Sequence, residues 1–255
     1  MKRTLIVVLL LAALFIPALT NAFQGTTKKQ KSPCATDLAH CPDQGCGGQF
    51  DPNLNRKKNI RTDNATPNLR TLTWVKKLDD PENFEQGGIR DELESLGEGQ
   101  MVTVVAYVLV IRDEPGGESC NCGLHSIPET DNHMVLVTKT TVDKFPFKTA
   151  ATSKTVLKQR EAESITAEFT PRVRLDHPNF LRKVIQPLID KTKQQALLAR
   201  ITGPLLFDSE HFIRNHLVRV NNWEIHPVFK FEFCSTGDNC KGNSNTGWKS
   251  IDDLP

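Results

Sequence analysis

Apolar and polar positions divide the chain into a polar N-terminal part and a remainder rich in strand-like segments. The run from Met101 to Ile111 is dense in β-branched and apolar residues, which is typical of a long buried strand. Shorter segments of strand character follow at about 132–139, 163–175, 197–207 and 223–233. The pattern therefore predicts five strands, all of them after residue 100.

A helix separates the third and fourth predicted strands. Pro178 can open it, and the pattern stays helical from Asn179 to about Lys193. Three strands, a helix and two further strands are the order of elements in the five-stranded oligonucleotide- and oligosaccharide-binding barrel, the OB-fold. The sequence predicts a mainly β protein with a small five-stranded OB-like barrel and one helix between strands 3 and 4. The alternatives are another small β-barrel or an α+β sandwich.

The first residues predict export. Lys2 and Arg3 precede an apolar run over residues 5–19, and residues 20–22, Thr-Asn-Ala, offer small side chains for a cleavage site. This is the pattern of a secretory signal peptide. The run is shorter than the about 20 residues of a membrane span, and no later segment is apolar enough to span a bilayer. We expect cleavage after Ala22 and a secreted or periplasmic mature chain without a membrane span.

Four parts make up the expected organisation: 1–22 signal peptide, 23–97 irregular cysteine-containing extension, 98–234 OB-like β-barrel and 235–255 C-terminal tail. The extension is rich in Lys, Asn, Pro and Gly and has little apolar periodicity. Its basic run at residues 55–59 is predicted to be a solvated loop. Residues 90–96 are predicted to form a short helix that Gly97 and Gly99 end.

All seven cysteines follow the predicted signal peptide. Because thiols pair in an oxidising compartment, export favours disulfides over a metal site. Cys234 and Cys240 flank a turn, which favours a local bridge. Cys120 and Cys122 are too close together for an unstrained bridge, so at least one is expected to pair with the N-terminal group. The alternative is a zinc cluster of Cys120, Cys122 and either His125 or His133. The disulfide candidates are Cys34, Cys41, Cys46, Cys120, Cys122, Cys234 and Cys240, which leaves one cysteine unpaired.

The net charge and the search for common motifs give no support to several functional classes, but they do not identify the function. The chain has 32 Lys and Arg against 30 Asp and Glu, a formal net charge of +2. This balance gives no basic field that would predict nucleic-acid binding. The sequence contains neither a Gly-x-Ser-x-Gly nucleophile motif nor a glycine-rich phosphate loop, so it gives no support to a serine hydrolase or a nucleotide-binding enzyme.

Acidic residues precede histidines at or next to three predicted strand ends. The candidate metal or polar site consists of Asp131 with His133, Asp208 with His211, and Glu224 with His226. In the first and third pairs the spacing is two, so acid and imidazole project from the same face of a strand. Such pairs can hold a divalent metal ion, which lowers the pKa of a bound water and supplies a hydrolytic nucleophile. They can equally form a structural hydrogen-bond network at the barrel end.

Two arginines form a separate candidate anion-binding site. Arg172 and Arg174 are two residues apart in the predicted third strand, so both side chains are expected on one face. Paired guanidinium groups there can bind a phosphate or a carboxylate.

Four motifs occur in order along the chain: Glu-Ser-Cys-Asn-Cys at 118–122, Asp-Asn-His at 131–133, Thr-Pro-Arg-Val-Arg at 170–174 and Trp-Glu-Ile-His-Pro at 223–227. Over about residues 100–233 this pattern resembles that of a family of uncharacterised exported bacterial proteins with an OB-like barrel. The resemblance implies a shared fold and a shared site, and it implies no substrate.

These observations favour an exported binding or interaction module of unknown ligand, with a glycan, a nucleic acid or an envelope protein as the partner. The alternative is a metal-dependent hydrolase of phosphodiesters or esters that uses the acid–histidine pairs and a divalent metal cofactor. A binding module predicts an exposed groove with aromatic and polar residues across the barrel face, whereas a hydrolase predicts that the acid–histidine pairs meet in one coordination sphere.

Overall fold

The computed structural model describes residues 32–255 apart from 49, 62–63, 83, 85–86, 151–152 and 212–217. The predicted signal peptide and its cleavage site lie outside these residues. Among the described residues, no helix is both long and apolar enough to cross a membrane.

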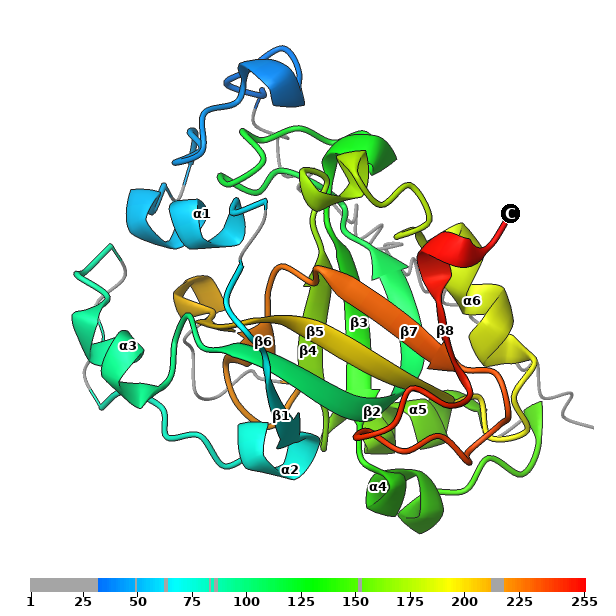
Figure 1. The fold of residues 1–255 in the computed structure, drawn as a ribbon. Helices are drawn as coiled ribbons and strands as arrows, with labels where there is room; N and C mark the ends of the chain where they lie inside the picture. The colour runs from blue at the N-terminus through cyan, green and yellow to red at the C-terminus, as the bar shows by residue number, and fades with distance from the viewer. Residues whose placement is uncertain are drawn as a thin grey trace, which may run out of the picture. The chain divides into compact units, whose positions relative to one another are not determined.

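Short helices and eight strands make up the described chain (Figure 1). The strands are β1 (Asn68–Thr71), β2 (Met101–Asp113), β3 (Asn132–Val137), β4 (Ile165–Phe169), β5 (Leu197–Phe207), β6 (Trp223–Ile225), β7 (Lys230–Cys234) and β8 (Trp248–Ser250). The α-helices are α1 (Pro52–Lys58), α2 (Leu72–Val75), α3 (Asp91–Leu96), α4 (Lys139–Lys144), α5 (Ser153–Glu161) and α6 (Arg182–Asp190). Single turns of 3-10 helix are η1 (Leu38–His40), η2 (Ile127–Glu129), η4 (Val173–Leu175), η5 (Ser209–His211) and η6 (Ile251–Asp253).

Five of the strands close into a barrel. β2 pairs with β3, β3 with β4, β6 with β5, and β5 with β2, all antiparallel, and β4 pairs with β6 in parallel. β1 adds to β2 in parallel, and β7 and β8 extend the sheet from β5. The protein is therefore mainly β with a closed five-stranded barrel, as the strand pattern predicts.

The helix between the third and fourth barrel strands packs against the barrel. α6 contacts β2, and its Ile185 and Ile189 are fully buried in the main apolar core. Burying a side chain of this size contributes about 1.5–3 kcal/mol. α6 begins at Arg182, after a turn in which the Phe180 amide donates to the His177 carbonyl, so Pro178 does not open the helix as expected.

Two predicted strands end or break at a proline. β4 ends at Phe169 and not near Leu175, because Pro171 has no amide hydrogen for a strand pairing and the chain turns there. The prediction that Arg172 and Arg174 share a strand face is therefore wrong. The expected last strand is split into β6 and β7, since Pro227 lies between them and lacks an amide donor.

Three disulfides are present among the described residues, and one of them, Cys41–Cys122, connects the N-terminal region to the loop after β2. The bonds are Cys34–Cys46, Cys41–Cys122 and Cys234–Cys240. The predicted Cys234–Cys240 bridge is present, and Cys122 pairs with the N-terminal group as expected. This bond removes Cys122 from the alternative zinc cluster. Cys120 is a buried free thiol.

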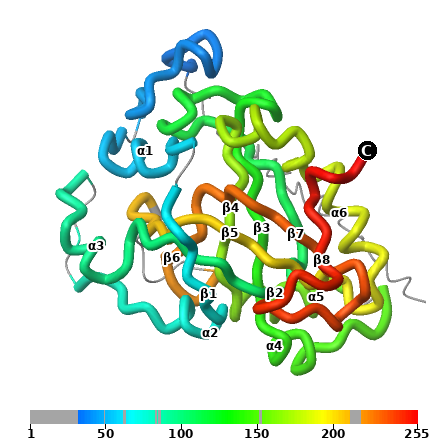
Figure 2. The backbone as a smooth tube through the Cα atoms, viewed as in Figure 1, coloured from blue at the N-terminus to red at the C-terminus, as the bar shows by residue number. Residues whose placement is uncertain are grey.

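The basic run at residues 55–59 is not the solvated loop that we expected. Most of it belongs to α1, whose N-cap Asp51 accepts hydrogen bonds from the Asn53 and Leu54 amides. The helix buries Leu54 and Lys58, because it lies beside the loop after β2 that Cys122 anchors (Figure 2). The predicted short helix is confirmed as α3, which ends at Gly97 with a φ of 124°.

Candidate functional site

Three barrel strands bring the predicted acidic and histidine residues together. Asp131 directly precedes β3, Glu168 lies in β4, and His226 directly follows β6. β3 and β4 pair with His133 opposite Glu168, and β4 pairs in parallel with β6. Because β4 lies between the other two strands, Glu168 stands between the residues that β3 and β6 supply.

The Glu168 carboxylate joins two imidazoles. Its Oε1 lies 2.8 Å from Nε2 of His133, and its Oε2 lies 3.1 Å from Nδ1 of His226. The other nitrogen of each ring also lies near a carboxylate. Nδ1 of His133 is 2.9 Å from Oε1 of Glu114, and Nε2 of His226 is 4.0 Å from Oδ2 of Asp131. A continuous row of alternating carboxylates and imidazoles results.

Three atoms at the buried end of this row have no hydrogen-bond partner among the described residues: Nε2 of His226, Oδ2 of Asp131 and Oε2 of Glu168. The imidazole of His226 and the carboxylate of Asp131 are held in place on their far sides: Nδ1 of His226 lies 3.4 Å from Oε2 of Glu224, and Oδ1 of Asp131 accepts a 3.0 Å hydrogen bond from Asn121. Leaving such a buried polar atom unsatisfied costs about 1–3 kcal/mol.

Arg219 links two more of the predicted residues to the cluster. Its Nη1 donates to Oε1 of Glu224 at 2.5 Å, and its Nη2 donates to Oδ2 of Asp208 at 2.8 Å. The predicted partner of Asp208, His211, ends η5, and its side chain lies outside the described part of the chain. Asp208 therefore reaches the cluster through an arginine that the sequence pattern did not identify.

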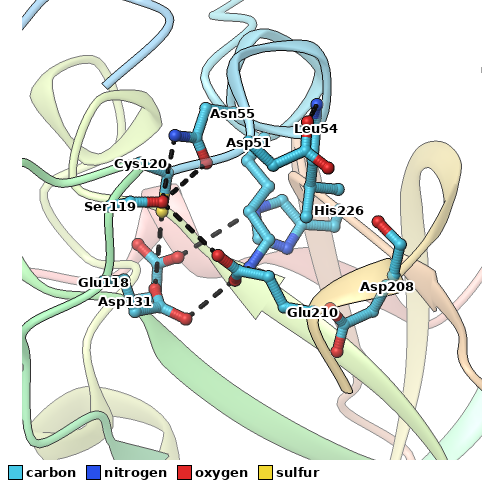
Figure 3. Close-up of polar contacts among 12 residues, drawn as sticks. Asp51, Leu54, Asn55, Glu118, Ser119, Cys120, Asp131, Asp208, Glu210 and His226 are labelled. Carbon is cyan, nitrogen blue, oxygen red and sulfur yellow. Dashed lines mark hydrogen bonds and ion pairs between the residues drawn. The ribbon is translucent and has the colours of Figure 1, made fainter. Parts of the chain in front are cut away.

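Further charged residues of the cluster come from α1, from the loop after β2 and from η5. Nζ of Lys58, whose side chain is 2% exposed, lies 3.2 Å from Glu210 and 3.6 Å from Glu118. Figure 3 shows Glu118, Cys120 and Asp131 near Glu210. One ligand atom of each of these three residues lies within 4.8 Å of the other two.

Negative charge exceeds positive charge in this cluster. Seven carboxylates face two permanent cations and two imidazoles, so three negative charges are in excess even when both imidazoles are protonated. The carboxylates belong to Glu114, Glu118, Asp131, Glu168, Asp208, Glu210 and Glu224, the cations are Lys58 and Arg219, and the imidazoles are His133 and His226. Uncompensated buried charge is unfavourable, so the cluster favours protons or a bound cation.

The carboxyl groups of Asp131 and Glu224 hold their protons tightly. Burial, and then the charge of Glu118, raises the pKa of Asp131 to about 7. Burial and the charge of Glu168 also raise the pKa of Glu224. A cation bound beside either carboxyl group would therefore displace the proton of that group.

The pKa values of the two imidazoles are raised, whereas that of Glu168 is lowered, because each of these groups favours the charged form of the other. Burial alone would lower the pKa of His226, but the Glu168 carboxylate raises it to about 10. Burial would likewise raise the pKa of Glu168, but the charges of His133 and His226 lower it well below its usual value. Glu168 is therefore ionised between two imidazoles, and its charge in turn favours their protonated forms.

Arg172 and Arg174 bind main-chain carbonyls of different segments. Arg172 donates to the carbonyls of Cys41 at 2.8 Å and Pro42 at 3.2 Å. Arg174 donates to the carbonyls of Ile127 and Thr130. The strand-face argument for a joint anion site at these two residues therefore no longer holds.

The sequence pattern did not select six residues of the cluster: Lys58, Glu114, Glu118, Glu168, Glu210 and Arg219. For Glu168 a signal existed, because a carboxylate stands there in the otherwise apolar end of a short strand, Ala167 to Phe169. Lys58 lies in a basic run that is usually solvated, and Arg219 has no local motif.

The buried end of the cluster has the donor set and spacing of a metal site. Asp131, Glu168 and His226 each offer one ligand atom within 4.8 Å of the other two. Zinc binds imidazole nitrogens and carboxylate oxygens at about 2.0–2.2 Å. The 4.0 Å between Nε2 of His226 and Oδ2 of Asp131 does not exceed the sum of two such bonds, so one ion between the two atoms can bind both.

Comparison with known proteins adds no function to this geometry. Neither a protein-family model nor a curated protein nor a solved structure matches this chain. The function must therefore be inferred from the cluster itself.

Proposed function

We propose that the protein holds one divalent transition-metal ion between Asp131, Glu168 and His226, and that this ion makes it a hydrolase of phosphodiesters or esters. The observation that carries the proposal is the pair of unsatisfied atoms, Nε2 of His226 and Oδ2 of Asp131, which lie 4.0 Å apart in the buried core. An ion bound there satisfies both atoms and offsets part of the excess negative charge.

The surrounding residues have roles that suit such an ion. Carboxylate oxygens of Glu168 and Glu224 lie 3.1 and 3.4 Å from Nδ1 of His226 and leave Nε2 for the metal, as carboxylates beside histidine ligands do in metal sites. A bound divalent ion lowers the pKa of a coordinated water and polarises an ester or phosphoryl oxygen. Lys58 and Arg219 place positive charge at the cluster, which favours an anionic substrate.

Solvent reaches the cluster at two edges: at Glu114 and His133, which are 23% and 27% exposed, and beside Lys58, at the edge nearer to Asp131. The side chains of Glu118 and Glu210 are 16% and 13% exposed, whereas that of Asp131 is 1% exposed. A ligand atom of Glu118 lies within 4.8 Å of one of Asp131. The edge beside Lys58 is the side from which we expect a substrate to approach.

Metal content tests the first part of the proposal. The protein is produced by export to an oxidising compartment, purified without chelator or histidine tag, and analysed for bound elements. We expect stoichiometric zinc, manganese or iron. Asp131→Asn and Glu168→Gln, which keep the side-chain size, should weaken binding of the same metal by about 100-fold or more. Glu114→Gln is the matched control, because Glu114 contacts His133 and lies outside the proposed ligand set.

Turnover tests the second part. The metal-loaded protein is assayed with bis(p-nitrophenyl) phosphate and with p-nitrophenyl acetate, beside Glu168→Gln and Glu114→Gln. Hydrolysis that follows metal content across the variants supports the hydrolase. A native protein with no metal, and no change in Tm on adding zinc or manganese, would overturn the metal site. Stoichiometric metal without hydrolysis would leave the ion as a structural element and overturn the enzyme.

We also propose that the barrel is OB-like and that the protein is exported after cleavage of a signal peptide. The closed strand order β2-β3-β4-β6-β5, with α6 between β4 and β5, supports an OB-like barrel. The three disulfides support export, because such bonds persist in oxidising compartments. If residues 1–22 are a cleaved signal peptide, N-terminal sequencing of the exported protein should begin at Phe23.

A binding module remains the second candidate function. An apolar hollow formed by η2, η4 and α6 favours it.

A further inference from the structure

A hollow of about 660 Å³ lies outside the polar cluster, between the end of β2, η2, η4 and α6. This volume falls within the about 300–1,000 Å³ of small-molecule sites. Its walls are mostly apolar, and four of the lining residues are prolines: Pro128, Pro171, Pro178 and Pro187. Because each proline ring fixes its own φ, these walls are preformed, which reduces the ordering that a ligand must bring about.

Two large apolar side chains at this hollow are open to solvent. Ile127 is 57% exposed and Leu175 is 70% exposed, and both line the hollow. A single exposed aliphatic side chain is ordinary on a protein surface. Two that line one apolar hollow indicate a binding site for an apolar group.

Positive charge dominates the polar part of the lining. Arg174, Arg182 and Lys183 line the hollow with one carboxylate, that of Asp113. Arg182 pairs with Asp113 at 3.3 Å. No described carboxylate forms an ion pair with Lys183 or Arg174.

Arg174 also has an unsatisfied donor. The residue is 8% exposed, and its Nη groups bind the carbonyls of Ile127 and Thr130, but its buried Nε has no hydrogen-bond partner. Arg174 forms no ion pair with a described carboxylate, so its guanidinium adds positive charge to the wall of the hollow, which favours an anion there.

We propose that this hollow binds an amphipathic carboxylate, with an unbranched apolar body against the proline and leucine walls and the carboxylate beside Arg174 and Lys183. A straight-chain fatty acid has this chemistry. The site is independent of the proposed metal centre, since none of Asp131, Glu168 and His226 lines the hollow.

Calorimetric titration with decanoate tests the ligand class. The full chain is treated with chelator first, so that a carboxylate cannot bind through a metal ion. We expect decanoate to bind with a dissociation constant on the order of 10–100 µM. Decanol, which lacks the charge, and decylammonium, which reverses it, should each bind at least about 10-fold more weakly, because the cationic lining then gains no partner.

Exposed residues provide variants that should fold normally. Leu175→Asp should weaken decanoate binding by at least about 10-fold, because it places a charge against the apolar chain. Lys183→Glu should weaken decanoate binding more than decanol binding. Ile89→Asp is the control, since Ile89 is 77% exposed and does not line the hollow.

Three results would overturn the proposal: no binding of decanoate to the chelator-treated protein, equal affinity for decanoate and decanol, or an equal loss of binding in Leu175→Asp and Ile89→Asp. The first would show that the hollow takes no such ligand. The second would remove the role of the positive charge, and the third would place the ligand elsewhere.

Discussion

Two buried ionic groups in this protein differ in how completely their atoms are bonded. In the Arg90–Glu98 pair, Arg90 donates to both carboxylate oxygens at 2.7 and 2.5 Å, to Ser209 at 3.1 Å and to the Phe207 carbonyl at 2.6 Å. The Phe207 amide donates in turn to Glu98 at 3.1 Å. Charges balance within the pair, and no side-chain atom of either residue is buried without a partner.

The Asp131–Glu168–His226 group has the opposite properties. Its carboxylates outnumber the nearby cations, and Oδ2 of Asp131 and Nε2 of His226 have no hydrogen-bond partner. A balanced and fully bonded ion pair has a structural role: removing either partner is costly, and no atom of the pair needs a ligand. A group with excess charge and unsatisfied buried atoms lowers the free energy of unfolding. A bound ligand that pairs the charge and bonds those atoms explains why the protein keeps such a group.

The largest expected effect is on the balanced pair. Arg90→Met should lower the free energy of unfolding by about 3–5 kcal/mol, because it leaves the Glu98 charge buried without a partner. The double variant Arg90→Met/Glu98→Leu should recover most of that loss. Urea denaturation of the two variants and the native protein measures both values. A double variant as unstable as the single one would show that the pair does more than balance its own charges.

Asp131→Asn should have the opposite sign. In chelator-treated protein at pH 8 we expect it to raise the free energy of unfolding by about 1–3 kcal/mol, because it removes one of the excess buried charges and keeps an oxygen for Asn121. The same variant should lose the metal. Urea denaturation with and without zinc checks the prediction. Lower stability in the absence of metal would mean that the Asp131 charge is part of the architecture.

A third comparison uses pH at the bidentate pair Arg200–Glu232. Burial would raise the pKa of Glu232, but hydrogen bonds from Arg200, at 2.7 Å to each oxygen, lower it. A lowered folded-state pKa means that the stabilisation is present above the unfolded value of about 4.3 and is lost as the pH falls through the folded value.

The variant Glu232→Gln isolates this contribution. It should be less stable than the native protein by about 1 kcal/mol at pH 7, and the difference should shrink towards zero below about pH 4. Thermal or urea unfolding across that range measures the difference. A difference that stays constant with pH would show that packing and not the charge of Glu232 is responsible.

The smallest effect is expected at the exposed end of the polar row. Glu114, 23% exposed, contacts His133 at 2.9 Å. Glu114→Gln should change the free energy of unfolding by less than about 1 kcal/mol and leave the metal affinity unchanged. If the affinity for zinc falls with this variant, the metal site extends as far as His133, and the ligand set proposed here is too small.

The pattern of apolar residues predicted the strands well where long-range pairing agreed with it. β2 and β5 lie where their runs of apolar and β-branched residues indicate them, because a strand buried on both faces has a strong local signal. The segment after β4 shows the limit of that signal. Its alternation continues past Phe169, but Pro171 cannot donate a hydrogen bond to a neighbouring strand, and the chain turns.

The candidate site was predictable only in part, for a related reason. The spacing of two in Asp131–His133 and Glu224–His226 predicts side chains on one face, and Glu224 does lie 3.4 Å from His226. That both pairs meet at Glu168 depends on the placement of β4 between β3 and β6. Strand order follows from contacts between distant segments, and no local pattern encodes it.

By itself, the sequence determined the β-rich class, the helix between the third and fourth barrel strands, and the Cys234–Cys240 bridge, because each depends on neighbours in the chain. Only the tertiary structure decided that Glu168 joins two imidazoles, that Lys58 is buried beside two carboxylates, and that Arg174 turns to a hollow. These features depend on burial and on charges that the fold brings together from distant segments. Such contacts change the free energy of a side chain, but they produce no pattern in the residues next to it in the sequence.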